Sequence, residues 1–108
     1  MKSPALKVLF VGAELEPLVK VGGLGDVMGS LPKALTKLGA DVKIVIPFYG
    51  SIDKSKFKTT LFKKNIAVDL GGGKTHFDLY KTKLPDSSPA AEVWLVKHKL
   101  FDAKEIYL

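Results

Sequence analysis

The chain has 108 residues, enough for one small domain with a buried core but too few for a complete two-substrate enzyme. Apolar residues make up 46% of it and charged residues 26%, proportions that exclude disordered and collagen-like chains. The 17 basic and 11 acidic side chains give a net charge of +6, and the absence of cysteine excludes disulfides, zinc-thiolate sites and thiol catalysis.

The basic excess comes from lysines scattered through predicted connections and strand ends, including Lys54, Lys56, Lys58, Lys63 and Lys64. No aromatic platform is interleaved with them, as single-strand nucleic-acid binders require. We therefore predict a solvated surface and no nucleic-acid partner. Residues 1–6 lack the apolar run of a signal peptide, and no stretch approaches the roughly 20 apolar residues of a membrane helix. A cytoplasmic location without a membrane partner is expected.

The first predicted element is a strand over residues 7–12, whose near-continuous apolar run favours a central strand covered on both faces in a parallel sheet. Residues 13–25 contain Pro17 and several glycines, which predict a long loop. Asp26 is then expected to cap a helix. Apolar residues recur on one face of that helix at helical spacing, namely Val27, Leu31, Ala34, Leu35 and Leu38.

That helix contains Pro32, which removes a backbone hydrogen bond, so a kink or a later start is expected. Gly39 is expected to end it in the left-handed conformation. Residues 41–47 form a second β-branched apolar run and predict a second strand. A right-handed βαβ crossover should connect the two strands, so the sheet is expected to begin parallel.

A β-hairpin is predicted next, because residues 65–70 and 75–84 flank the triplet Gly71-Gly72-Gly73. The remaining segments are predicted to be a loop, a buried strand and an irregular tail, at residues 85–89, 92–96 and 97–107. The predicted fold class is therefore α/β, a Rossmann-like parallel-sheet domain with a β-hairpin insertion. Because doubly wound domains continue with further βα units, a chain that stops after its third parallel strand looks truncated.

The most informative stretch lies between the first strand and the first helix, at the carboxyl edge where open α/β sheets bind ligands. Glycines at positions 22, 23 and 25 let backbone amides approach an oxyanion without interference from a Cβ atom. The helix start adds a partial positive charge and Lys20 a full one. Together these features suit a pyrophosphate, although spacing alone is equally compatible with a tight turn beside a solvated lysine.

Residues Lys20-Val21-Gly22-Gly23-Leu24-Gly25-Asp26-Val27 resemble the Lys-x-Gly-Gly-Leu motif near the N-terminus of bacterial glycogen synthases and plant starch synthases. The surroundings are similar too, and the resemblance runs along the whole chain. It is carried by Glu14, Pro17, Leu31-Pro32-Lys33-Ala34-Leu35, Val45-Ile46-Pro47, Phe101-Asp102 and Glu105-Ile106-Tyr107.

The resemblance implies a retaining glycosyltransferase built from two Rossmann-like domains, the GT-B arrangement. Such an enzyme transfers glucose from a nucleotide diphosphate glucose, here with ADP-glucose favoured, to the non-reducing end of an α-1,4-glucan. Residues 1–108 would form part of the N-terminal domain, and the rest of that domain and the C-terminal nucleotide-binding domain would be absent. The resemblance implies no cofactor and no metal.

The family's site roles carry over to six positions: Lys20, Gly22, Gly23, Asp26, Glu14 and Tyr107. Lys20 would contact the donor's phosphates, while the two glycines would place backbone amides beside the pyrophosphate and glucose. Asp26 and Glu14 match positions near the cleft, and Tyr107 matches a tyrosine that lines the donor site. No catalytic residue is expected within the chain. Because the second domain would supply the opposite side of the site, the isolated chain is expected to be inactive.

Two other functions stay open beside this one. Gly23-x-Gly25-x-x-x-Gly29 is close to a dinucleotide fingerprint, which would indicate a fragment of an oxidoreductase, but the second strand ends without the acidic residue that a ribose needs. A non-catalytic Rossmann-like binding module is the third possibility. The segment Gly71-Gly72-Gly73-Lys74-Thr75 ends like a P-loop, yet lacks the first glycine and the following helix, so a hairpin turn is expected.

The remaining polar and aromatic side chains give weak signals. His76 and His98 have no neighbours at metal-ligand spacing and receive no role. Trp94 is expected in the core rather than as a sugar-stacking platform. No acid-base pairing can be recognised among the carboxylates of Asp53, Asp69 and Asp86.

Overall fold

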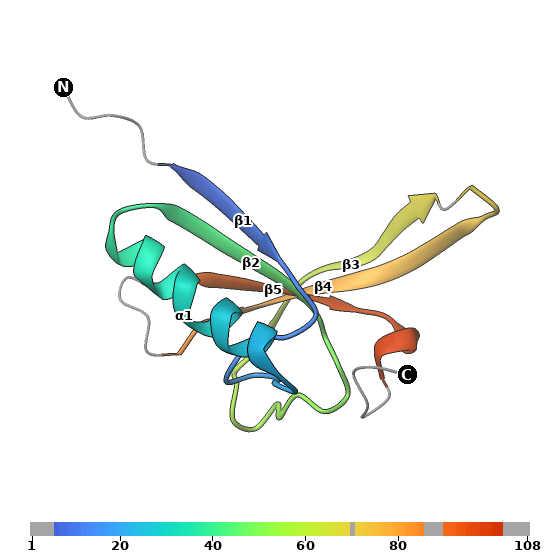
Figure 1. The fold of residues 1–108 in the computed structure, drawn as a ribbon. Helices are drawn as coiled ribbons and strands as arrows, with labels where there is room; N and C mark the ends of the chain where they lie inside the picture. Colours follow the sequence, from blue (N-terminus) through green and yellow to red (C-terminus); the bar gives the residue numbers. More distant parts are fainter. Residues whose placement is uncertain (1–5, 70, 86–89, 103–108) are drawn as a thin grey trace.

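A computed structural model describes residues 6–69, 71–85 and 90–102. Its elements are β1 (Lys7–Val11), α1 (Gly23–Lys37), β2 (Asp41–Pro47), β3 (Thr60–Asp69), β4 (Lys74–Lys83), β5 (Glu92–Lys97) and the 3-10 helix η1 (Lys99–Phe101). The strands form one sheet in the order β1-β2-β5-β4-β3 (Figure 1). Strands β1, β2 and β5 run parallel, and β3 and β4 form an antiparallel hairpin beside β5. The predicted α/β class with an added hairpin is confirmed.

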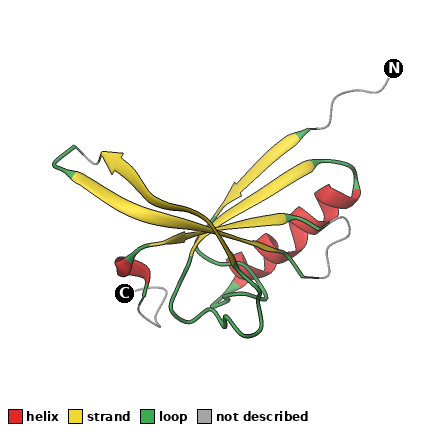
Figure 2. Ribbon diagram, turned by 180° about the vertical axis from the view of Figure 1, so that it is seen from behind, coloured by secondary structure: helices red, strands yellow, loops and turns green. Residues whose placement is uncertain are grey.

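Helix α1 covers one face of the parallel strands, and the hairpin reaches out beyond it (Figure 2). Strand β2 falls at its predicted residues and alternates, with Val42, Ile44 and Ile46 buried in the core. The core continues into β5 through Val93 and Leu95, which are fully buried. Because α1 lies against β2, its N-terminal end is held near the carboxyl ends of the parallel strands, where the candidate loop lies.

The prediction of a central first strand is wrong for the described residues, because β1 is an edge strand. Val8 and Phe10 pack against the core, whereas Leu9 is 62% exposed and Val11 is 71% exposed. A short apolar run has the same sequence pattern whether one or both faces are covered, so periodicity does not separate the two cases.

The start of α1 also differs from the prediction. The helix begins at Gly23 with Gly22 as its N-cap, and no side chain caps it. Asp26 therefore lies inside the first turn, where its negative charge is still favourable to the helix dipole. Gly23 and Gly25 are part of the helix, although glycine has a low helix propensity. The helix therefore starts closer to the loop than predicted.

The buried face of α1 differs from the predicted one, of which Leu35 packs against the core. The side chains of Val27, Leu31 and Leu38 are 53%, 43% and 84% exposed. The buried positions are instead Gly25, Met28, Gly29, Pro32 and Thr36. Small residues let the helix approach the preceding loop closely, and this contact outweighs the burial of the more apolar stripe.

The helix passes through Pro32 and ends as expected. The expected later start does not occur, because α1 runs from Gly23 to Lys37 with Pro32 inside it. The Thr36 hydroxyl donates to the Pro32 carbonyl over 2.8 Å. Gly39 adopts a φ of +98°, which confirms the predicted left-handed C-terminal position.

The predicted hairpin is present, but β3 begins at Thr60, earlier than expected, so Lys63 and Lys64 lie within a strand rather than at its end. Gly71 and Gly73 have φ values of +86° and +157°, a geometry that suits a turn between strands. Strand β4 follows the turn directly, which rules out the P-loop alternative.

The third parallel strand, β5, is confirmed, and the tail after it contains the short helix η1 that the prediction missed. The predicted loop at 85–89 and the end of the tail lie largely outside the described residues. Within the described residues, no helix has both the length and the apolar character needed to cross a membrane.

Candidate functional site

The loop between β1 and α1 is held by its own contacts. Leu15 and Val19 exchange two backbone hydrogen bonds of 2.8 and 2.9 Å, and the Glu16 amide donates to the Gly25 carbonyl over 3.0 Å. Leu15, Leu18 and Val19 are buried in the core. The predicted loop is thus an ordered segment packed against the start of the helix.

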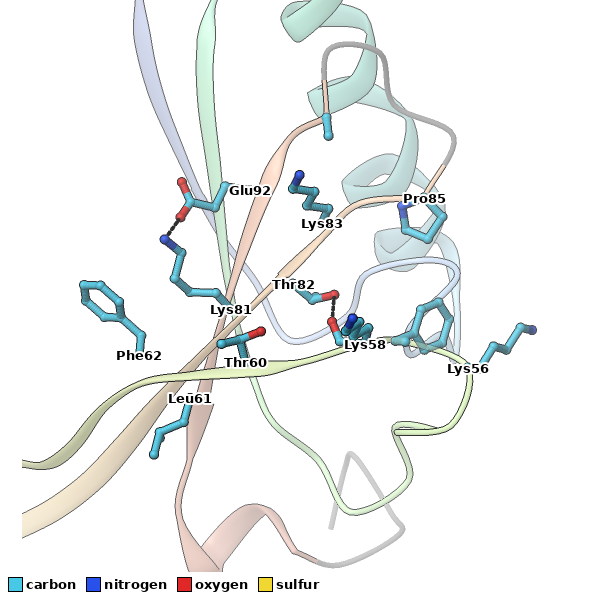
Figure 3. Close-up of a pocket in the computed structure, with 12 residues that line it drawn as sticks. Lys56, Lys58, Thr60, Leu61, Phe62, Lys81, Thr82, Lys83, Pro85 and Glu92 are labelled. Atoms are coloured by element: carbon cyan, nitrogen blue, oxygen red, sulfur yellow. Dashed lines mark hydrogen bonds and ion pairs between the residues drawn. The ribbon is translucent and has the colours of Figure 1, made fainter.

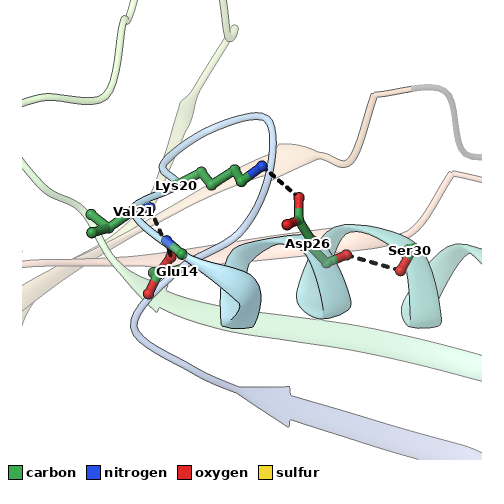
Figure 4. Close-up of polar contacts among 6 residues, drawn as sticks. Glu14, Lys20, Val21, Asp26 and Ser30 are labelled. Atoms are coloured by element: carbon green, nitrogen blue, oxygen red, sulfur yellow. Dashed lines mark hydrogen bonds and ion pairs between the residues drawn. The ribbon is translucent and has the colours of Figure 1, made fainter.

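A buried carboxylate anchors the end of this loop. Glu14 is only 3% exposed, and its Oε1 accepts hydrogen bonds from the amides of Val21 and Gly22, each 2.8 Å long (Figure 4). The pKa of Tyr49 is raised mainly by burial, and the negative charge of Glu14 raises it further. Glu14 therefore fixes the chain at the point where the loop enters α1.

Lys20 and Asp26 form an ion pair across the mouth of the loop. Lys20 Nζ lies 2.8 Å from Asp26 Oδ1, and the two side chains are 46% and 57% exposed (Figure 4). The hydrogen bond and charge of Asp26 raise the pKa of Lys20 above its ordinary value. Lys20 is therefore a cation at neutral pH, and a ligand that approaches from solvent can reach it.

The glycines of the motif divide into two kinds. A Cβ atom added at Gly29 would lie 2.5 Å from the Glu16 carbonyl oxygen, and one at Gly25 would lie 3.0 Å from Lys20 Cγ, so close packing explains both. A Cβ added at Gly22 or Gly23 would meet no atom within 4 Å. Neither residue has a positive φ. The fold therefore accounts for Gly25 and Gly29, whereas open space lies beside the adjacent pair.

This division also bears on the near-dinucleotide fingerprint. Two of its three glycines, Gly25 and Gly29, have a packing role within the chain. Their presence therefore no longer requires a nucleotide.

The sequence profile of the starch synthase catalytic domain matches residues 7–108. The chain belongs to this starch synthase catalytic-domain family. The resemblance stated from the Lys-x-Gly-Gly-Leu motif is thereby confirmed.

Individual members of the family agree with this assignment. Glycogen synthase 1 of Synechocystis sp. is 43% identical over 103 residues, which cover 94% of this chain and 20% of the relative. The glycogen synthase of Hydrogenobaculum sp. is 42% identical over 100 residues, covering 93% and 19%. The chain thus spans about a fifth of the length of the curated relatives it matches.

A solved structure supports the fold assignment. The catalytic domain of Starch Synthase IV from Arabidopsis thaliana, bound to ADP and acarbose, superposes with a TM-score of 0.84 at 25% sequence identity. The match covers 97% of this chain and 22% of that one. The described sheet and helix are therefore a segment of a starch synthase catalytic domain.

A hollow of about 780 Å³ lies elsewhere on this synthase segment, between residues 56–62 and strands β4 and β5 (Figure 3). Four lysines line it, namely Lys56, Lys58, Lys81 and Lys83. Glu92 also lines it and pairs with Lys81 over 2.6 Å. None of the predicted substrate-binding residues lines this hollow, so it is separate from the β1–α1 loop.

Trp94 lies in a small cluster on the sheet rather than in the core, so its predicted location is wrong. It is half-buried and meets Phe62 edge to face, with 4.7 Å between ring centroids. Lys81 Nζ lies 4.7 Å from the centre of the Trp94 ring. Neighbours within the chain therefore contact the Trp94 ring.

The two histidines stay without a functional role. His98 Nδ1 accepts from the Leu100 amide over 3.1 Å, so the proton of the neutral ring sits on Nε2, 2.9 Å from the Thr75 hydroxyl. His76 is exposed on β4. Among the residues that the structure describes, no cluster of three or more potential metal ligands occurs.

The other carboxylates serve local turns. Asp53 accepts from the Ser55 amide and hydroxyl, and these hydrogen bonds lower its pKa. Asp69 accepts from the Gly71 amide over 2.9 Å. Asp86 lies outside the described residues, as does the candidate site residue Tyr107.

The structure brings five of the six candidate residues together at the loop and helix start: Glu14, Lys20, Gly22, Gly23 and Asp26. Sequence reasoning missed how they are connected. The ion pair has a recognisable signal, an acidic residue in the first helical turn shortly after a lysine. The two amide bonds of Glu14 have none, because they depend on how the loop folds back on itself.

Proposed function

We propose that this segment contributes the donor-phosphate loop of a retaining glucosyltransferase. The full enzyme would transfer glucose from ADP-glucose to the non-reducing end of an α-1,4-glucan in glycogen or starch synthesis. It would have the two-domain GT-B architecture and act in the cytoplasm, and residues 1–108 would form part of its N-terminal Rossmann-like domain. Lys20, Gly22, Gly23, Asp26, Glu14 and Tyr107 would line the donor site.

The observation that carries the proposal is the open space beside Gly22 and Gly23. Neither backbone geometry nor packing within the described residues calls for glycine at these positions. The space adjoins the start of a helix and a lysine cation, two features that favour an anion. A diphosphate bound there would account for a pair of glycines that the fold itself leaves unexplained.

The relatives support the nature of the donor and the acceptor. The Arabidopsis structure contains ADP, which favours an adenine nucleotide as the leaving group. It also contains acarbose, and the curated relatives are glycogen synthases, which favours a glucan acceptor.

Replacing Lys20 with alanine in a full-length synthase carrying this segment is expected to weaken donor binding about tenfold. One charge-assisted contact to phosphate is lost, and the partial exposure of the side chain places the effect at the lower end of the usual range. The change in donor binding is measured by calorimetry, as the dissociation constants for ADP-glucose, UDP-glucose and NAD. Lys64→Ala, which removes an exposed lysine on β3, is the matched control.

The three ligands separate the candidate functions. Binding of ADP-glucose that is weakened by Lys20→Ala and unaffected by Lys64→Ala supports the proposal. Preference for NAD would favour an oxidoreductase, and binding of none of them would favour a non-catalytic module. Equal ADP-glucose affinity in the Lys20→Ala variant and the unaltered enzyme would remove the phosphate assignment.

The isolated chain 1–108 is expected to transfer no glucose. One loop positions at most one side of the transferred sugar and leaves the site open to water. The assay is incorporation of labelled glucose from ADP-glucose into glycogen, with an intact family synthase as the positive control. Incorporation above the rate of a heat-denatured sample would contradict the expectation.

A further inference from the structure

Glu14 has a buried carboxylate to which the proposed function assigns no specific task. It is 3% exposed, and its Oε1 receives the amides of both Val21 and Gly22 at 2.8 Å. Lys20 Nζ forms its ion pair with Asp26, 2.8 Å away. A carboxylate that accepts two backbone amides is held in one orientation and in turn holds the chain that donates to it.

The same contacts decide which amides remain for a ligand. The N–H of Gly22 donates to Glu14 in this loop. The Gly25 amide donates to the Gly22 carbonyl over 3.2 Å. The first amides of a helix have no acceptor within it. Those of Gly23 and Leu24 form no hydrogen bond with another described residue.

Glu14 also limits the space on the inner side of the loop. A Cβ atom added at Gly25 would lie 3.1 Å from Glu14 Oε1, whereas one added at Gly22 or Gly23 would meet nothing within 4 Å. The carboxylate is thus packed against the first helical turn at Gly25. The positions that Cβ atoms at Gly22 and Gly23 would take lie in open space.

We infer that Glu14 is a positioning residue for the donor's diphosphate. By holding the amides of Val21 and Gly22, it sets the loop so that the amides of Gly23 and Leu24 are left for the anion. This inference rests on the proposed function, since it names the residue that shapes the same site. Gly22 then contributes through its missing side chain and not through its amide.

Acceptor geometry, and not negative charge, is what this role requires. A carboxylate beneath an anion site repels the anion, so its charge alone does not improve donor binding. Glutamine keeps an acceptor oxygen at the same reach without the charge. Aspartate keeps the charge but is shorter by one carbon–carbon bond of about 1.5 Å, too short to hold two amides at the observed distances.

The test compares Glu14→Gln, Glu14→Asp and Glu14→Ala in a full-length synthase carrying this segment, with Lys20→Ala measured alongside. The Asp and Ala variants are expected to raise the donor KM and the dissociation constant for ADP about tenfold, with the glucan KM unchanged. The Gln variant is expected to stay within about threefold of the unaltered enzyme. Thermal unfolding of each variant is recorded, and the Asp and Gln pair suffices if the Ala variant does not fold.

Each outcome has a defined meaning. Gln behaving like Ala, or Asp like the unaltered enzyme, would show that charge matters and acceptor position does not, which overturns the inference. A fall in kcat with unchanged donor KM and ADP affinity in all three would indicate only a loss of folded protein, which also overturns it. If Lys20→Ala alone weakens ADP binding, the inference about Glu14 fails while the proposed function stands. Unchanged ADP binding in every variant removes both.

Discussion

Donor binding is expected to weaken about a hundredfold when Gly23 is replaced by valine in a full-length synthase, while folding is unaffected. A Cβ atom at Gly23 meets no atom of the chain within 4 Å, and the residue is exposed in the first turn of α1. The new side chain would therefore occupy the space that we assign to the diphosphate. The measurements are the ADP dissociation constant, the KM for the donor and the thermal unfolding temperature.

Gly72→Val serves as the matched control for Gly23→Val. Gly72 lies in the turn between β3 and β4, also has nothing within 4 Å of an added Cβ atom, and has no positive φ. Neither its donor binding nor its unfolding temperature should change appreciably. If the valine at position 23 leaves donor binding intact, the open space there is not the anion site.

Replacing Gly29 with valine is expected to affect folding rather than donor binding directly. The free energy of unfolding of the chain should fall by about 3 kcal/mol. Gly29 is buried within α1, and a Cβ atom there would lie 2.5 Å from the Glu16 carbonyl oxygen. Because the obstacle is backbone, the helix itself must shift away from the loop. Helix propensity favours valine over glycine by only a few tenths of a kcal/mol, which is too little to offset the clash.

Urea unfolding of the chain followed by tryptophan fluorescence measures this effect. Trp94 is the single tryptophan, and it is half-buried beside Phe62, so its emission reports the loss of structure. Gly23→Val is the control on the same helix and should unfold at the urea concentration of the unaltered chain. An unchanged midpoint for Gly29→Val would mean that α1 and the loop do not approach each other as closely as described.

The strands and the hairpin were predictable because their sequence signals are local. Strand β2 was predicted with its observed bounds, and the turn at Gly71 and Gly73 was predicted from its glycines. The edge position of β1 was not predictable, since sheet order depends on contacts between segments distant in sequence. Local patterns therefore located the elements, but not their neighbours.

The orientation of α1 shows where hydrophobic periodicity fails. The helix has apolar residues around much of its circumference, so the stripe through Val27 and Leu31 looked suitable for burial. The face through Gly25 and Gly29 is buried because it permits close approach to the Glu16 backbone. Shape complementarity to the loop decided the outcome, and single-residue hydrophobicity contains no information about it.

The sequence predicted residues that the structure brings together at the loop, but not the contacts that connect them. The motif identified Lys20 and the glycine pair, and Asp26 was assigned the wrong structural role, since it pairs with Lys20 and caps nothing. The hydrogen bonds of Glu14 span a loop whose path depends on the burial of Leu15 and Leu18. Such bonds follow from tertiary structure and have no sequence signature.

The ion pair between Lys20 and Asp26 has a consequence for selectivity. An incoming anion obtains the ammonium group only by competing with a carboxylate that already lies 2.8 Å away. Chloride or a monoester gains little from such an exchange, because it replaces one negative partner with another. A diphosphate bound as proposed would also engage peptide amides and gain additional hydrogen bonds, so chloride and other small anions would compete weakly with it.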